Sequence, residues 1–183
     1  TTAELQATVN VTIQGSGMGD VSIVRSNAPG TPDFRIFQVQ AGVSATLRGL
    51  TIYGGRVAGA GGGIWNGGTL ALVNSVVFNN AALAPDGNGG GIATTAGTLT
   101  LTNSVVENNN ALNNGGGIFQ LNGSLELTGS TVSGNTASTG WGGGIYKFNG
   151  SLTATNTTIS GNTAGTLGGG LNINRGATLR FVT

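Results

Sequence analysis

Residues 98–102, Thr-Leu-Thr-Leu-Thr, alternate polar and apolar side chains with a period of two. This alternation predicts a strand that is buried on one face, with Leu99 and Leu101 pointing inward. Residues 103–104, Asn-Ser, predict a corner, and residues 105–106, Val-Val, predict a second short strand. A turn and a third strand complete a unit of about 26 residues, which is a normal length for one coil of a parallel β-helix.

The same pattern of apolar positions returns in other parts of the chain. The inward positions of the first strand are filled by Leu70 and Leu72, Leu125 and Leu127, Leu152 and Ala154, and Leu179 and Phe181. The inward position of the second strand is filled by Val77, Val106, Val132 and Ile159. Each unit therefore predicts the same set of short strands.

A Gly-Gly-Gly triplet followed by an aliphatic residue marks the third side of each unit. The five copies are Gly61–Ile64, Gly89–Ile92, Gly115–Ile118, Gly142–Ile145 and Gly168–Leu171. Their nearly constant spacing indicates a stacked repeat array. No helix pattern or P-loop lysine follows the triplets, so we interpret them as left-handed corners and points of close coil packing instead of phosphate loops. The predicted fold is all-β: a right-handed parallel β-helix (β-solenoid) of about six to seven coils.

Asparagines recur at two places in each unit. The corner after the first strand holds Asn74, Asn103, Gly129 and Asn156, and the turn after the second strand holds Asn80, Asn109, Asn135 and Asn162. Asparagine tolerates left-handed backbone values, and stacked side-chain amides can bond to one another along a solenoid axis. We therefore predict a structural asparagine ladder at the second position, with no ligand role.

We expect the whole 183-residue chain to form one domain. The regular repeats cover residues 49–183, and residues 1–48 predict longer, less regular coils. In this frame Asn10 and Gly49 both occupy the asparagine corner, so the coil between them is much longer than the regular repeat. The turn-forming residues at positions 25–34 predict a loop within that coil.

Composition narrows the functional classes. Seven Lys or Arg residues balance six Asp or Glu residues and are scattered along the chain, so we expect no nucleic-acid partner. Cysteine is absent, which rules out disulfides and thiolate metal sites. No apolar run approaches the ~20 residues of a membrane-spanning helix, so we expect a chain that is not membrane-embedded. Because it begins at Thr1 without Met or a leader, we expect a processed product or an excised piece of a longer protein.

The repeat resembles that of a known bacterial family. The glycine triplet is followed by an aliphatic-x-x-Asn-x-Ala turn, as in residues 132–137 and 159–164. This combination resembles the repeats of polymorphic outer-membrane proteins and autotransporter passenger domains, whose turn motif carries Phe where this chain has Val or Ile. More broadly, the chain looks like the pectin-lyase-like class of parallel β-helices. The resemblance implies an exported bacterial protein, and this class includes lyases, hydrolases, adhesins and inert stalks.

The acidic residues do not form a catalytic pattern. They are Glu4, Asp20, Asp33, Asp86, Glu107 and Glu126, and the chain has no histidine. Glycoside hydrolysis needs at least two neighbouring carboxylates, and no two of these are placed in one column of adjacent predicted coils. We therefore predict no enzymatic activity, no catalytic residues, no cofactor and no metal site.

Aromatic residues near the triplets are the candidate contact residues. They are Trp65, Phe119, Trp141, Tyr146 and Phe148. They can form a strip on which a carbohydrate stacks, or they can serve internal packing or a contact between subunits. Both interpretations stay open at this point.

Solenoid ends expose unpaired strand edges, and the sequence shows no pattern for a cap at either end. We therefore expect the chain to continue into further coils or to self-associate head to tail. The predicted function is a non-catalytic structural module of an exported bacterial surface protein, extracellular or on the cell surface, as an adhesin stalk or a filament subunit. The alternative is a carbohydrate-binding or degenerate polysaccharide lyase or hydrolase domain.

Overall fold

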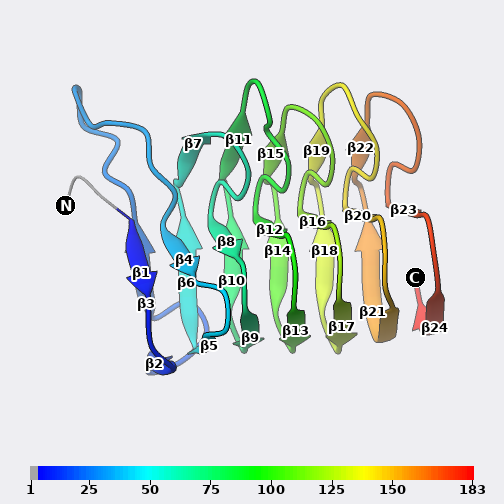
Figure 1. The fold of residues 1–183 in the computed structure, drawn as a ribbon, viewed down its shortest axis with the longest axis horizontal. Helices are drawn as coiled ribbons and strands as arrows, with labels where there is room; N and C mark the ends of the chain where they lie inside the picture. The colour runs from blue at the N-terminus through cyan, green and yellow to red at the C-terminus, as the bar shows by residue number, and fades with distance from the viewer. Residues whose placement is uncertain (1–3) are drawn as a thin grey trace.

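Twenty-four short strands wind into a β-solenoid in the computed structural model, which describes residues 4–183 (Figure 1). The coils stand side by side from the N-terminal to the C-terminal end, and all the strand pairs between neighbouring coils are parallel. The described residues contain no helix, and thus none that could span a membrane. The predicted fold class is confirmed, and only the first three residues of the predicted domain lie outside the described residues.

Each regular coil contributes one strand to each of four ladders. The triplet ladder contains β1 (Leu5–Ala7), β4 (Phe37–Val39), β8 (Ile64–Asn66), β12 (Ile92–Thr94), β16 (Ile118–Gln120), β20 (Ile145–Lys147) and β23 (Leu171–Ile173). The long ladder contains β2 (Val11–Gln14), β5 (Ser44–Arg48), β9 (Thr69–Val73), β13 (Thr98–Thr102), β17 (Ser124–Thr128), β21 (Leu152–Ser160) and β24 (Ala177–Val182). The second ladder contains β3 (Val21–Val24), β6 (Leu50–Tyr53), β10 (Val76–Phe78), β14 (Val105–Glu107), β18 (Thr131–Ser133) and the end of β21. The short ladder contains β7 (Arg56–Ala58), β11 (Ala81–Leu83), β15 (Asn110–Ala111), β19 (Thr136–Ala137) and β22 (Thr163–Ala164).

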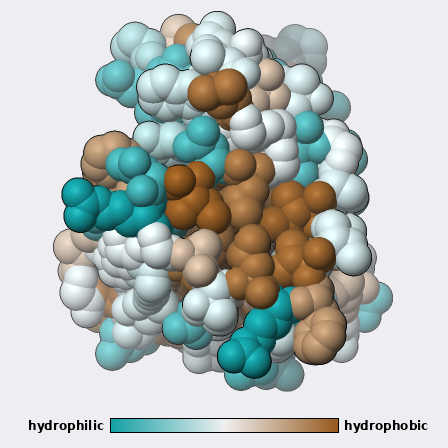
Figure 2. All heavy atoms as spheres, turned by 90° about the vertical axis from the view of Figure 1, so that its right-hand side faces the viewer, coloured by the Kyte–Doolittle hydropathy of each residue, from teal (hydrophilic) through white to brown (hydrophobic). Residues whose placement is uncertain are grey.

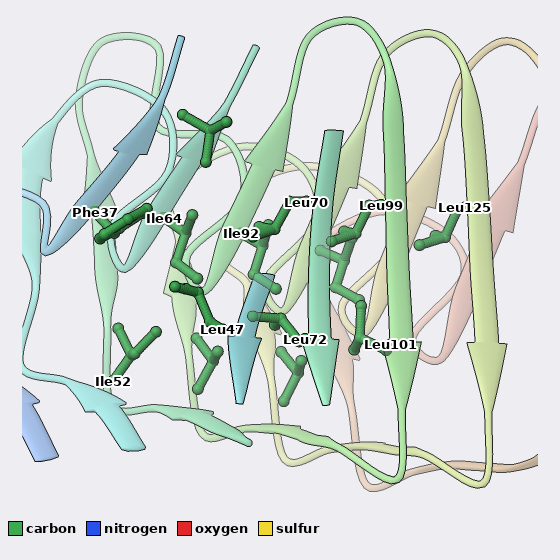
Figure 3. Packing of buried hydrophobic residues seen from close by; sticks show 14 of the residues in the cluster. Phe37, Leu47, Ile52, Ile64, Leu70, Leu72, Ile92, Leu99, Leu101 and Leu125 are labelled. Atoms are coloured by element: carbon green, nitrogen blue, oxygen red, sulfur yellow. The ribbon is translucent and has the colours of Figure 1, made fainter. Parts of the chain in front are cut away.

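The core is built from columns of apolar side chains, as the alternation predicts. Leu99 and Leu101 of β13 are fully buried, and the register places them between the paired leucines of β9 and β17. Figure 3 shows such side chains turned into the interior from several coils. Burying one leucine contributes about 2 kcal/mol, so a column that repeats in every coil supplies a continuous stabilising core.

The short ladder is the element that the sequence reasoning missed, since it predicted three strands per coil and the structure has four. Its strands contain only two or three residues, too few to show an alternation. Their small inward residues, Ala82, Ala111 and Ala137, are fully buried, so this side of the coil packs closely.

The glycine triplets occupy the corner before the triplet ladder. Gly115 has a left-handed φ of 64°, and the first glycine of each other triplet is also left-handed. A Cβ on Gly117 would lie 2.7 Å from the carbonyl oxygen of Gly144 and 2.9 Å from Cγ of Asn135. The third glycine therefore lets the neighbouring coil and an asparagine side chain approach closely, which matches the prediction of close coil packing.

Left-handed backbone values occur at the first asparagine corner, as predicted, but not at the ladder asparagines. Asn74, Asn103 and Asn156 have φ values of 48°, 48° and 50°. At the second turn the left-handed residue precedes the ladder position, as Asn79 and Asn108 show with φ values of 52°. The ladder side chains are thus free to turn inward from an ordinary backbone conformation.

The predicted frame is wrong at the N-terminal end. Because Val11 of β2 pairs with Ala45 of β5, the residue opposite Gly49 is Gly15 and not Asn10. Asn10 lies at the other end of the strand, where its Oδ1 accepts a hydrogen bond from the backbone N–H of Ser44 at 2.8 Å. The coil between the two corners is therefore shorter than predicted but still longer than the regular repeat, and the predicted loop lies within it, between β3 and β4.

The predicted frame is also shifted at the C-terminal end. Leu152 pairs with Ala177, so Leu179 lies opposite Ala154, two positions from its predicted place. Phe181 then occupies the corner with φ 50° and is 83% exposed, although the alternation predicts an inward residue there. The cause is the length of this coil, because the step from Leu152 to Ala177 is shorter than the preceding step from Leu125 to Leu152.

Candidate functional site

The outer side of the triplet ladder carries a column that includes three aromatic side chains. Trp65, Ala93, Phe119 and Tyr146 occupy successive positions of this column, since each pairs with the next across β8, β12, β16 and β20. Their strand neighbours on the other side, such as Ile118, are fully buried in the core. The period-two alternation therefore directs these rings to the outside.

Four of the five candidate aromatic residues lie close together around Tyr146. We call this group, Phe119, Trp141, Tyr146 and Phe148, the aromatic surface. The ring centroid of Tyr146 lies 5.5 Å from that of Phe119, 6.1 Å from that of Trp141 and 6.5 Å from that of Phe148. The planes differ by only 8° to 24°, so the rings are nearly parallel. Trp65 stacks on none of these rings, because Ala93 stands between it and Phe119 in the column, but it packs against the cluster of Ala93, Phe119 and Tyr146.

Exposure divides the aromatic surface into a packed centre and two open flanks. Phe119 and Tyr146 are 9% and 8% exposed, whereas Trp141 and Phe148 are each 42% exposed. Burial raises the pKa of Tyr146, so its phenol stays neutral at physiological pH. The group thus presents exposed rings and a neutral hydroxyl.

A hollow of about 300 Å³ adjoins the aromatic surface. It is lined by Trp141, Tyr146, Phe148, Leu167, Asn172, Ile173 and Asn174. The sequence reasoning missed the residues of the last coil in this lining. The register could have found Asn172, because it is the partner of Tyr146 one coil further along.

The predicted asparagine ladder lies inside the solenoid, at the turn between the second and short ladders. The side-chain bonds run from Asn80 Nδ2 to Asn109 Oδ1 at 3.0 Å, from Asn109 Nδ2 to Asn135 Oδ1 at 3.0 Å, and from Asn135 Nδ2 to Asn162 Oδ1 at 2.9 Å. Each acceptor Oδ1 also takes the backbone N–H of the preceding asparagine. The remaining amide protons bond backbone carbonyls, as Asn109 Nδ2 does with Val77 O at 3.0 Å. These amides join successive coils, and those of Asn80, Asn109 and Asn135 are buried.

A second buried set, the mixed polar column, lies on the inward side of the triplet ladder. It comprises Asn66, Thr94, Gln120 and Lys147, all fully buried. These residues were not singled out from the sequence. The signal was present, because each follows the buried aliphatic residue of its triplet by two positions and so lies on the same face of the strand.

Lys147 is the unusual member of this column. Its Nζ donates to the carbonyl oxygens of Gly123, at 2.9 Å, and Asn149. Gln120 makes equivalent bonds one coil earlier, from Nε2 to Asn122 O at 2.6 Å and to Gly97 O at 3.3 Å. Burial lowers the pKa of Lys147, because the ammonium is removed from water. Within residues 4–183 the ion pairs all involve arginine, so no carboxylate offsets this cost.

The acidic residues are distributed over several parts of the solenoid. Glu4 pairs with Arg35 at 3.4 Å, and Asp33 pairs with Arg56 at 3.1 Å. Glu107 and Glu126 lie on β14 and β17, strands of different ladders. Across residues 4–183 there is no group of three or more acidic, histidine or cysteine side chains placed to hold a metal ion.

Comparison with known proteins gives no match: no protein-family model, no curated protein and no solved structure is significantly similar to the chain. The functional argument therefore depends on the fold, its ends and the aromatic surface.

Proposed function

We propose that the chain is a non-catalytic structural module of an exported bacterial surface protein, either an adhesin stalk or a filament subunit. The support comes from the stacked coils with their uninterrupted core and asparagine ladder, which form a rod that needs no ligand. The triplets and Asn-x-Ala turns that resemble polymorphic outer-membrane protein and autotransporter passenger repeats support export and a surface location.

The observation that carries this proposal is the state of the two ends. Within the described residues the ladders finish on strands with one unpaired edge, among them β1, β2 and β3 at one end and β22, β23 and β24 at the other. Figure 2 looks onto the C-terminal end and shows a broad apolar surface there. A copy of the solenoid translated along its axis keeps all strand directions, so a further coil of similar cross-section extends each ladder as a parallel pair.

Charge favours the same arrangement. The N-terminal segment 1–24 carries two acidic residues, Glu4 and Asp20, and no basic residue. The C-terminal segment 149–183 carries two basic residues, Arg175 and Arg180, and no acidic residue. Between two copies of the chain these opposite charges favour head-to-tail contact, with Asp20 as the acid that no arginine of the described residues pairs with.

Sedimentation and electron microscopy of the 183-residue chain test this role. We expect association that grows with concentration and rods of constant width. Leu179→Lys, which places a charge on the exposed apolar end, is expected to abolish it, because Leu179 is 47% exposed on the last strand of the long ladder. Ala96→Lys adds the same charge to an exposed turn on the side and serves as the control. A monomer without rods at all concentrations would overturn self-stacking.

The enzymatic alternative, a degenerate polysaccharide lyase or hydrolase, has a separate test. Asp33 and Glu4 are held by arginines, and the other acids are spread over different elements. We therefore expect no unsaturated products and no new reducing ends when the chain is incubated with polyuronides. The appearance of either product would contradict the non-catalytic role.

A further inference from the structure

The stacked rings of the outer column end at Tyr146. Phe119 stacks on Tyr146 from the preceding coil, with ring planes 8° apart. The partner of Tyr146 in the following coil is Asn172, which has no ring. The position where a further ring would stack on Tyr146 therefore holds a shorter asparagine side chain.

The hollow lies at this step, between two coils that both belong to the chain. The earlier coil contributes Trp141, Tyr146 and Phe148 to its wall, and the later coil contributes Leu167, Asn172, Ile173 and Asn174. Its volume of about 300 Å³ is at the lower end of the range for small-molecule sites. Because Asn172 and Ile173 belong to β23, the last strand of the triplet ladder in the described chain, the hollow adjoins the C-terminal end.

The chemistry of the lining restricts the ligand. Among the described residues no charged side chain lines the hollow, and Lys147, although it lies between Tyr146 and Phe148, is buried on the other side of the strand. Aromatic faces attract C–H groups, and asparagine amides both donate and accept hydrogen bonds. A ligand with apolar ring faces and hydroxyl edges satisfies both kinds of group, whereas an anion would find no cation in this lining.

We propose that the hollow beside Tyr146 is a binding site for neutral sugar rings, which stack on the aromatic surface and bond the amides of Asn172 and Asn174. The open rings of Trp141 and Phe148 supply the contact area, since each is 42% exposed. This role goes beyond the proposed structural function and does not require association of the ends.

A fluorescence titration tests the proposal. Trp65→Phe leaves Trp141 as the one tryptophan, so emission reports directly on the hollow. We expect a saturable change with soluble neutral oligosaccharides, tested as gluco-, manno- and xylo-tetrasaccharides, and at least a tenfold weaker response to a tetragalacturonate of similar length. In this background Phe148→Ala is expected to weaken binding about tenfold and Asn172→Ala about fivefold.

Phe78→Ala is the matched control, because Phe78 stacks on Tyr53 with centroids 4.9 Å apart on another ladder. That second aromatic pair adjoins a hollow lined by Glu107 and by no asparagine of the described chain, so we expect unchanged sugar binding. Circular dichroism and thermal unfolding verify that each variant is folded. Two results would overturn the proposal: no saturable response to any neutral sugar, or an equal loss of sugar binding in Phe78→Ala.

Discussion

The asparagine ladder and the mixed polar column are two of the buried polar columns inside the solenoid, and they differ in what their side chains hydrogen-bond. In the asparagine ladder each amide bonds the amide of the next coil, as Asn80 does with Asn109. In the mixed polar column the side chains mainly bond backbone carbonyls of the adjoining turns, as Gln120 and Lys147 do.

This difference explains which residue types occupy each column. A side chain that bonds its own equivalent must be both donor and acceptor and must keep one length, so asparagine repeats in four successive coils. A side chain that bonds a backbone carbonyl needs only to donate. The ammonium group of Lys147 can therefore occupy the position that the amide of Gln120 occupies one coil earlier, and both hydrogen-bond the adjoining turn. Identity is therefore required along the ladder, whereas the mixed column combines donors to turn carbonyls at Asn66, Gln120 and Lys147 with an acceptor at Thr94.

The largest effect is expected for Asn109→Ala. This change removes the acceptor of the Asn80 backbone N–H and side-chain amide, and it removes the side-chain donor to the carbonyl of Val77. Each buried group left unsatisfied costs about 1–3 kcal/mol, so we expect a loss of about 3 kcal/mol in the free energy of unfolding, measured by urea denaturation. Asn108→Gly, at an exposed left-handed position, is expected to change the free energy of unfolding little. Equal losses in the two variants would show that the ladder bonds contribute nothing specific.

A smaller loss is expected for Gly117→Ala. The added methyl group meets Gly144 O and the amide of Asn135, so it pushes the ladder away from the triplet. Overpacking of this kind costs about 2 kcal/mol. Gly170→Ala is the control, because the equivalent methyl group meets only Ile159 Cγ2, at 3.3 Å. An equal decrease in the melting temperature of both variants would contradict the contact between the glycine triplet and the asparagine ladder.

Lys147→Gln tests whether the mixed column accepts any donor. Gln120 already makes the equivalent bonds one coil earlier, so we expect the variant to fold. It is expected to be up to about 1 kcal/mol more stable at pH 7 in urea denaturation, because it removes a buried charge.

The stability difference between Lys147→Gln and the wild type depends on pH, and the lowered pKa of Lys147 fixes the direction of that dependence. The pKa of Lys147 is lowered in the folded chain, so the unfolded chain binds the proton more tightly, up to the ordinary pKa of 10.5. Wild-type stability therefore gains from deprotonation as pH rises from the folded pKa towards 10.5, and the advantage of the variant shrinks over that window. Denaturant titrations at a series of pH values measure this difference, and a difference independent of pH would contradict a buried ammonium.

The smallest effect is expected for Thr94→Val in the mixed column. Its Oγ1 accepts a hydrogen bond from Asn66 Nδ2 at 3.4 Å, which is long, and Asn66 keeps a second bond to the carbonyl of Thr98 at 3.1 Å. We expect a loss below about 1 kcal/mol in urea denaturation. A loss as large as that of Asn109→Ala would remove the distinction between the columns.

The sequence allowed prediction where coils have similar lengths. The triplets and the alternation of β13 placed the core leucines of the regular coils in the correct columns, whereas the direction of the aromatic rings was left open. Prediction failed at Asn10 and Phe181, because a long coil before Gly49 and a short one before Ala177 change the frame without changing the local pattern. A period read from the middle of the chain carries no information about such length changes.

The candidate site was predictable only in part. The aromatic residues stood out by type, but the hollow depends on Asn172 following Tyr146 in register, which only correct pairing of the last coil shows. Lys147 was overlooked because a lysine is ordinarily exposed, although strand alternation placed it on the inward face with Ile145.

Hydrogen exchange of the asparagine side-chain amides, followed by NMR, tests the central claim most directly. The claim is that a continuous chain of hydrogen bonds between asparagine side-chain amides joins the coils inside the solenoid. It predicts that the Nδ2 protons of Asn80, Asn109 and Asn135 exchange at least about 100-fold more slowly than those of exposed Asn108. Exchange of the ladder amides at the rate of Asn108 would contradict the claim.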